Sequence, residues 1–293
     1  MSFNDNASLD TSQVSGGGRG RGGLAVGGGI GGLLIVVVGL FFGVDLSGVT
    51  GTDPGTTTPD TSSTLAAKCR SGADANTDVD CRLVGTVNSV QAYWATALPA
   101  AGATYVRVNT VDYQGQTQSA CGTASNAVGP FYCPTDQLVY IDTSFFAELT
   151  TRFGADDGAL AQEYVVAHEY GHHVQDILGL LDNAQRDPQG ATSGAVRTEL
   201  QADCLAGMWA NGAASTKDAN GRTYLKPLTD KDIASALSAA SAVGDDRIQQ
   251  KSQGGVNPEA WTHGSAEQRQ RWFTTGYTKG DLEACDTFSA RTL

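Results

Sequence analysis

The chain has 293 residues, which suffice for one sizeable domain or two small ones. Hydrophobic residues make up 40% of it and aromatic residues 8%, proportions that fit a globular core. The formal net charge of −12 argues against a nucleic-acid-binding protein, which needs a basic surface.

A polar tail followed by an apolar run makes up the first 44 residues. Residues 1–23 are polar and low in complexity, without apolar periodicity, so we expect a disordered tail. Residues 24–44 carry no charge, and roughly 20 apolar residues are enough to cross the hydrocarbon core of a bilayer. Glycines weaken the first half of this run, but the second half, LLIVVVGLFFGV, is strongly hydrophobic. The run therefore predicts one transmembrane helix that anchors the protein in a membrane.

A cleaved signal peptide is the alternative interpretation of this run. It would have a shorter leader and an A-x-A-like cleavage site, and neither feature is present. Arg19 and Arg21 precede the run and Asp45 follows it. The positive-inside rule then predicts a single-pass cell-membrane protein with a cytoplasmic N-terminus and an extracytoplasmic remainder. Residues 45–66 are rich in Thr, Ser, Gly, Pro and Asp, which indicates a flexible linker, and the folded domain is expected at residues 67–293.

All six cysteines lie after residue 68, in the part expected outside the cytoplasm. An even number of cysteines in that setting predicts three disulfides. Pairing by proximity in sequence joins Cys69 with Cys81, Cys121 with Cys133, and Cys204 with Cys285. Six cysteines allow 15 connectivities, so this local pairing is the simplest of several. No C-x₂-C pair is present, which argues against a zinc site built from cysteines.

Hydrophobic periodicity predicts more helices than strands in the domain. Helices are expected at residues 80–97, 143–152, 159–181, 194–211, 229–243 and 266–277, and strands at residues 104–113 and 137–142. Few strands among many helices predict an α+β domain, mostly helical with a small sheet.

Three of the four histidines lie within six residues, in the segment HEYGHH. His168 and His172 are four residues apart, so on a helix they share a face and can bind one metal ion. Glu169 lies about 100° further round the helix, where it can reach a metal-bound water without binding the metal. Zinc lowers the pKa of such a water to about 7, and the carboxylate can take its proton. His173 points away from His172 and is not expected to bind the metal.

A catalytic zinc site also needs a third protein ligand. The metzincin pattern HExxHxxGxxH fails here, because Gln175 and Leu178 occupy its last two defined positions. Glu199 and Asp203 follow on the helix expected at residues 194–211, one turn apart. This resembles the gluzincin pattern, which implies Glu199 as the third ligand and Asp203 as a residue that orients a ligand histidine. A solvated helix face is the alternative for such a pair.

Several segments together resemble the bacterial family of putative neutral zinc metallopeptidases. They are residues 119–142, 165–175, 197–210, 244–249 and 262–277. The resemblance implies a zincin-like metallopeptidase domain that binds Zn²⁺ through His168, His172 and Glu199, with Glu169 as the general base. Residues 1–100 share only the plan of tail, anchor and spacer.

The sequence therefore predicts a membrane-anchored, extracytoplasmic zinc peptidase that acts on a peptide or protein substrate. The substrate is expected along an edge strand, for which residues 137–142 are the candidate. His263 is the candidate donor to the charge that develops on the substrate carbonyl oxygen, with Arg269 and Arg271 as alternatives. Two other functions stay open: a zinc-bearing binding or scaffold module without turnover, and a structural domain that binds no metal. Intact Glu169 favours the enzyme.

Overall fold

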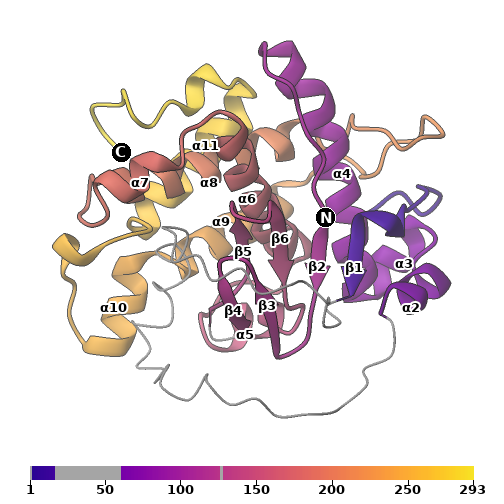
Figure 1. The fold of residues 1–293 in the computed structure, drawn as a ribbon, viewed down its shortest axis with the longest axis horizontal. Helices are drawn as coiled ribbons and strands as arrows, with labels where there is room; N and C mark the ends of the chain where they lie inside the picture. Colours follow the sequence, from indigo (N-terminus) through magenta and orange to yellow (C-terminus); the bar gives the residue numbers. More distant parts are fainter. Residues whose placement is uncertain (1, 17–60, 126–127) are drawn as a thin grey trace.

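The computed structural model describes residues 2–16, 61–125 and 128–293 (Figure 1). The helices are η1 (Thr11–Gln13), α2 (Thr61–Lys68), α3 (Gly72–Thr77), α4 (Val79–Ala100), α5 (Phe145–Thr151), α6 (Ala159–Ile177), α7 (Asp182–Arg186), α8 (Gly194–Gly212), α9 (Asp230–Ala242), α10 (Asp245–Gln253), η4 (Pro258–Ala260), α11 (Ala266–Lys279) and η5 (Glu283–Cys285). The strands are β1 (Val14–Gly16), β2 (Thr110–Asp112), β3 (Gln116–Ser119), β4 (Gly122–Ser125), β5 (Phe131–Cys133) and β6 (Leu138–Ile141). The predicted α+β class, mostly helical with a small sheet, is confirmed for this part of the chain.

Four strands form a mixed sheet in the order β1-β2-β6-β5. β1 is parallel to β2 and β2 is parallel to β6, whereas β5 is antiparallel to β6. β3 and β4 form a separate antiparallel pair. Figure 1 shows α2 and α3 beside β1, at one side of the sheet, and α7, α8 and α11 at the other side. The strand expected at residues 104–113 is shorter than predicted, because only Thr110–Asp112 pair with neighbours.

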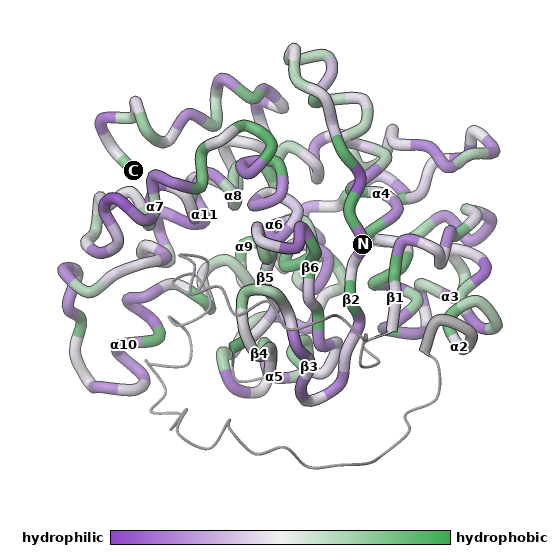
Figure 2. The backbone as a smooth tube through the Cα atoms, viewed as in Figure 1, coloured by the Kyte–Doolittle hydropathy of each residue, from purple (hydrophilic) through white to green (hydrophobic). Residues whose placement is uncertain are grey.

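The position of β6 corrects one expectation. Residues 137–142 were expected to form an edge strand, but β6 lies between β2 and β5 and is paired on both sides. Its backbone groups are therefore committed to the sheet and cannot pair with a substrate. β5 forms the edge of the sheet on this side, among the strands that the structure describes. Figure 2 shows mostly hydrophobic residues along β6 and mostly hydrophilic residues along α7 and α10.

α6, α8 and α11 pack closely because glycines occur where their backbones meet. A Cβ atom on Gly171 of α6 would lie 3.0 Å from the carbonyl oxygen of Ala202 on α8. On α11, a side chain at Gly276 would collide with the carbonyl group of Cys204. Ser193 stabilises the start of α8 by accepting a hydrogen bond from the backbone N–H of Val196. The close approach of α6 and α8 brings their polar side chains within reach of each other.

Three disulfides connect the described chain, and they are the pairs expected from the sequence. They join Cys69 with Cys81, Cys121 with Cys133, and Cys204 with Cys285. The third one links the middle of α8 to η5, across 81 residues of sequence. It therefore ties the carboxyl-terminal end of the chain to the helix that carries Glu199 and Asp203.

The expectation of a disordered tail at residues 1–23 is wrong for residues 2–16. Phe3, Ala7 and Val14 are buried in the main hydrophobic core, and β1 adds a strand to the sheet. Three buried apolar side chains and paired backbone groups stabilise the segment, although most of its residues are polar. α2 begins at Thr61, so residues 61–66 are helical rather than linker.

The predicted transmembrane helix at residues 24–44 lies outside the described residues, as does most of the predicted linker. Among the helices that the structure does describe, none is both long enough and apolar enough to span a bilayer.

Candidate metal centre

The two histidines of the HEYGH segment lie one turn apart on α6 and face the same side. Both are buried, and their ring centroids are 4.8 Å apart. Tyr170, between them in sequence, is buried on another face, where its hydroxyl lies 2.9 Å from the hydroxyl of Thr110 on β2. This bond connects α6 to the sheet. The helix thus holds His168 and His172 as a preformed pair.

Glu199 reaches the histidine pair from α8. Its Oε2 atom is 3.2 Å from Nε2 of His168, and its Oε1 atom is 3.4 Å from Nε2 of His172. One ligand atom from each of the three residues lies within 4.8 Å of the others. Zinc with nitrogen and oxygen ligands at about 2.0–2.2 Å places tetrahedral ligand atoms roughly 3.3–3.5 Å apart. The donor set and its spacing therefore fit a zinc ion.

Asp203 holds the ring of His168 from the side opposite the candidate metal position. Its Oδ1 atom lies 2.9 Å from Nδ1 of His168, which leaves Nε2 directed toward Glu199. Arg269 of α11 donates two hydrogen bonds to the same carboxylate, from Nε to Oδ2 at 2.8 Å and from Nη2 to Oδ1 at 2.9 Å. The hydroxyl of Tyr164 is 2.5 Å from Oδ1. Burial alone would raise the pKa of Asp203. The opposing effect of the charges of Arg269 and His168 is larger, so the pKa of Asp203 lies below its usual range.

The hydrogen-bond partner of His172 is Gln175, a residue that no sequence motif assigns to the site. Its Oε1 atom lies 2.8 Å from Nδ1 of His172. Its amide nitrogen donates to the carbonyl oxygen of Thr198 and to Oε1 of Gln201, both on α8. Gln175 is fully buried. Each of the two candidate ligand histidines therefore has a separate partner that fixes its ring, as is general for metal sites.

Glu169 lies beside the predicted metal position without belonging to the metal-binding group. It lines the same pocket as His168, His172 and Glu199. Burial raises its pKa, while the two neighbouring histidines partly oppose that rise. A carboxylate with a raised pKa next to a metal-bound water is suited to general acid–base chemistry. This placement agrees with the role predicted for it.

His263 enters the pocket from the loop before α11. Asp245, at the start of α10, holds this loop by accepting hydrogen bonds from the backbone N–H groups of residues 262–264. Nδ1 of His263 lies 3.3 Å from Oδ1 of Asp245 and 2.9 Å from the hydroxyl of Thr262. Burial lowers the pKa of His263, but the charges of Glu199 and Asp245 raise it above its usual range. A protonated His263 would face the site as a hydrogen-bond donor.

The other candidate donors and the neighbouring histidine are engaged elsewhere. Arg271 donates to the carbonyl oxygen of Leu293 and pairs with Glu267, so it does not face the pocket. His173 lies 3.1 Å from the hydroxyl of Tyr132 and 2.7 Å from the carbonyl oxygen of Val106. His173 is therefore not among the three residues that could hold a metal ion together, which are His168, His172 and Glu199.

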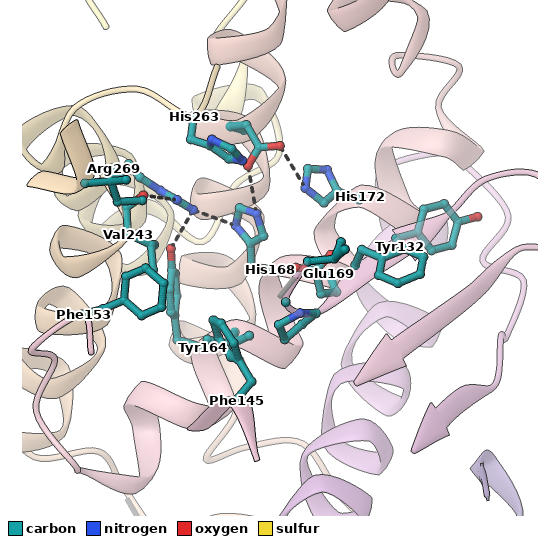
Figure 3. Close-up of a pocket in the computed structure, with 17 residues that line it drawn as sticks. Tyr132, Phe145, Phe153, Tyr164, His168, Glu169, His172, Val243, His263 and Arg269 are labelled. Carbon is teal, nitrogen blue, oxygen red and sulfur yellow. Dashed lines mark hydrogen bonds and ion pairs between the residues drawn. The ribbon is translucent and has the colours of Figure 1, made fainter. Parts of the chain in front are cut away.

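The rest of the pocket wall is largely apolar, and β5 forms part of it. Its apolar side chains come from the β4–β5 loop, β5, α5, α6, α10 and the segments next to them: Val128, Pro130, Phe131, Phe145, Phe153, Val165, Val243 and Ile248. Figure 3 shows Phe145 and Phe153 on one side of the histidine pair and Tyr132 on the other. The site therefore combines a compact polar centre with room for apolar groups.

A second group of possible metal ligands, Cys69, Asp78 and Cys81, does not form a competing site. The two cysteines are joined in a disulfide and have no free thiolate. The donors on α6 and α8 are thus the one group of this kind, among the described residues, that is free to bind metal.

Comparison with known proteins agrees with this donor set. The family described as "Putative neutral zinc metallopeptidase" matches residues 3–288. The chain belongs to this family. The match begins at residue 3, so it includes the amino-terminal segment as well as α6 and α8, which carry the candidate ligands.

Two relatives indicate how widely this zinc metallopeptidase family is spread. "Uncharacterized protein Mb2605" of Mycobacterium bovis is 58% identical over 228 residues, covering 78% of this chain and 76% of that protein. "Uncharacterized protein YpfJ" of Escherichia coli K12 is 38% identical over 275 residues, covering 92% of this chain and 87% of that protein. No solved structure matches the chain.

Proposed function

We propose that this protein hydrolyses peptide bonds with one zinc ion held by His168, His172 and Glu199. The observation that carries the proposal is the convergence of these three ligand atoms within 4.8 Å, with Glu169 beside them in the same pocket. When bound, zinc would polarise the substrate carbonyl and lower the pKa of a bound water to about 7. Every other step is assigned to side chains of this chain.

Glu169 would take a proton from the attacking water and return it to the leaving amine. Its raised pKa makes the carboxylate a stronger base toward the proton of the water, and the carboxylic acid that results can pass this proton to the leaving amine. His263 would donate a hydrogen bond to the negative charge that develops on the carbonyl oxygen. Arg269 is a positioning residue, since its Nε and Nη2 groups donate to Asp203 and its Nη1 group donates to the carbonyl oxygen of Val243.

The substrate class follows from the edge of the sheet and from the pocket wall. β5 has a neighbour on one side only among the described strands, and its residues Phe131 and Tyr132 line the pocket. An extended peptide could pair with this edge as an added strand. The apolar wall would then favour a large apolar side chain next to the cleaved bond. Three disulfides support a location outside the cytoplasm.

Glu169→Gln tests the mechanism, because it removes the base and keeps the shape of the side chain. We expect the variant to bind one equivalent of zinc and to lose peptide hydrolysis in a digest of a peptide library. Glu259→Gln is the matched control, since Glu259 is exposed on η4, away from the pocket residues. Full activity of Glu169→Gln would refute the mechanism. Zinc binding by the unaltered protein without turnover on any peptide would favour the alternative of a zinc-bearing binding module.

A further inference from the structure

The amino-terminal segment, residues 2–16, is joined to parts of the domain that are far apart in sequence. Near its start, Phe3 forms a β-bridge with Leu225, and the side-chain amide of Asn4 donates to the carbonyl oxygens of residues 223 and 225. In its middle, Ser8 forms a β-bridge with Ser71, the residue just before α3, and its end forms β1 on the sheet. Residues 2–16 therefore cross the domain in contact with it along most of their length.

The domain has polar side chains whose partners lie in this segment. Asn88 of α4 is 1% exposed; its Oδ1 accepts from the backbone N–H of Asp10, and its amide donates to the carbonyl oxygen of the same residue. Gln91, also 1% exposed, donates to Oε1 of Gln13. Asp218 accepts from the backbone N–H of Ser8. These buried groups therefore have hydrogen-bond partners that only the segment supplies.

The shape of the domain also matches the segment. The ring of Phe3 rests on Gly85 of α4, where a Cβ atom would lie only 2.6 Å from Cε1 of the ring. At Gly72 a Cβ atom would collide with the carbonyl group of Asn4. Val14 is 2% exposed, and β1 covers the edge of β2. A strand edge left open is prone to pair with other chains, so β1 completes the sheet.

We propose that residues 2–16 and residues 61–293 lie on the same side of the membrane. The hydrocarbon core of a bilayer is about 30 Å thick, and a single crossing by residues 24–44 would separate the two parts by at least that distance. The bonds between them are ordinary hydrogen bonds, such as the 2.9 Å bond from the backbone N–H of Asn4 to the carbonyl oxygen of Tyr224. Segments on opposite faces of a bilayer cannot form such hydrogen bonds. The contacts between the two parts therefore exclude the single-pass topology that charge asymmetry predicts.

Labelling of single introduced cysteines in the full chain, in intact cells, tests which side each part occupies. Ser8 is exposed on the segment, and Thr274 is exposed on α11 of the domain. We expect Ser8→Cys and Thr274→Cys to react with a membrane-impermeant maleimide to the same extent, both before and after permeabilisation. Opposite patterns for the two positions would overturn the proposal. Neither readout depends on peptidase activity, so failure of the proposed function would not affect the result.

Cross-linking tests whether the segment docks on the domain. Ser8 and Ser71 face each other across an antiparallel bridge, where Cα atoms about 4.5–5.5 Å apart fall within the range for a disulfide. Ser8→Cys combined with Ser71→Cys should form a fourth disulfide that links residues 2–16 to α3, detected by non-reducing peptide mapping. Ser8→Cys combined with Thr274→Cys is the control and should form none. Free thiols at both positions of the first pair would refute docking.

Discussion

Replacing Asp203 with asparagine removes the charge at the centre of the buried network behind His168. The carboxylate is fully buried and binds Arg269, His168 and Tyr164. Asparagine keeps the size of the side chain, but its amide nitrogen can accept no hydrogen bond. The guanidinium of Arg269, whose side chain is 4% exposed, would then be a buried charge without a counter-charge at this position.

Breaking a buried ion pair by removing one partner costs about 3–5 kcal/mol. For a domain of this size each 1 kcal/mol lowers Tm by roughly 2–4 °C, so Asp203→Asn should lower Tm by roughly 6–20 °C. Loss of a partner that orients a metal-binding histidine typically weakens metal affinity by about 10–100-fold. The two effects are separable, because unfolding can be measured in the presence of a chelator and zinc affinity by competition below the unfolding temperature.

Two further variants determine whether the unpaired charge of Arg269 causes the loss of stability in Asp203→Asn. Asp182→Asn on α7 is the control, since Asp182 is largely exposed and should change Tm little. Arg269→Met combined with Asp203→Asn should be more stable than Asp203→Asn alone, because the unpaired charge is gone. An Asp203→Asn protein within 1 kcal/mol of the unaltered protein, with unchanged zinc affinity, would refute this account of the network.

Two other predictions concern Glu163 and His263. Burial raises the pKa of Glu163 to about 7 from a usual value of 4.5, and neither carboxylate oxygen has a hydrogen-bond partner among the described residues. The folded state then binds this proton more tightly than the unfolded state, so the contribution of Glu163 to stability is fully present below pH 4.5 and is lost as pH rises to about 7, by about 3 kcal/mol. Urea unfolding of Glu163→Gln should show a gain over the unaltered protein that is larger at pH 8 than at pH 5; an equal difference at both would contradict this. His263→Ala should keep zinc and fold but lose on the order of 10²-fold in kcat, and an unchanged kcat would remove His263 from the mechanism.

The residues of the candidate metal centre could be picked out from the sequence because local geometry determines most of their arrangement. Helical spacing alone puts His168 and His172 on one face, and a second short motif, with the family resemblance, adds Glu199 and Asp203. Arg269 and Gln175, which hold Asp203 and His172 in place, could not be found from local patterns in the sequence. Arg269 meets Asp203 only through the packing of α11 on α8, 66 residues later, and Gln175 depends on α8 for its other hydrogen bonds.

Long-range pairing also explains two of the structural expectations that were wrong, the edge position of β6 and the disordered tail. Whether a strand is central or at an edge depends on its neighbours, and β6 becomes central because β2, well before it in sequence, pairs with its open side. The amino-terminal segment shows no periodicity, since only Phe3, Ala7 and Val14 among its apolar residues are buried. Its order comes from partners on α3, α4 and the sheet, which no local pattern in residues 2–16 indicates.

The docked segment affects how zinc binding and peptidase activity should be measured. A protein that starts at residue 67 lacks the core positions of Phe3, Val14 and Leu65. Truncating one buried phenylalanine typically costs about 3–5 kcal/mol, a large part of the roughly 5–15 kcal/mol that stabilises a folded protein. Gln91, which binds the segment, also accepts from the backbone N–H of Val108, and the carbonyl of nearby Val106 binds His173, next to the ligand His172. Loss of residues 2–16 would therefore weaken the contacts that support α6. Inactivity of such a fragment would then result from a destabilised fold and would not test the catalytic mechanism.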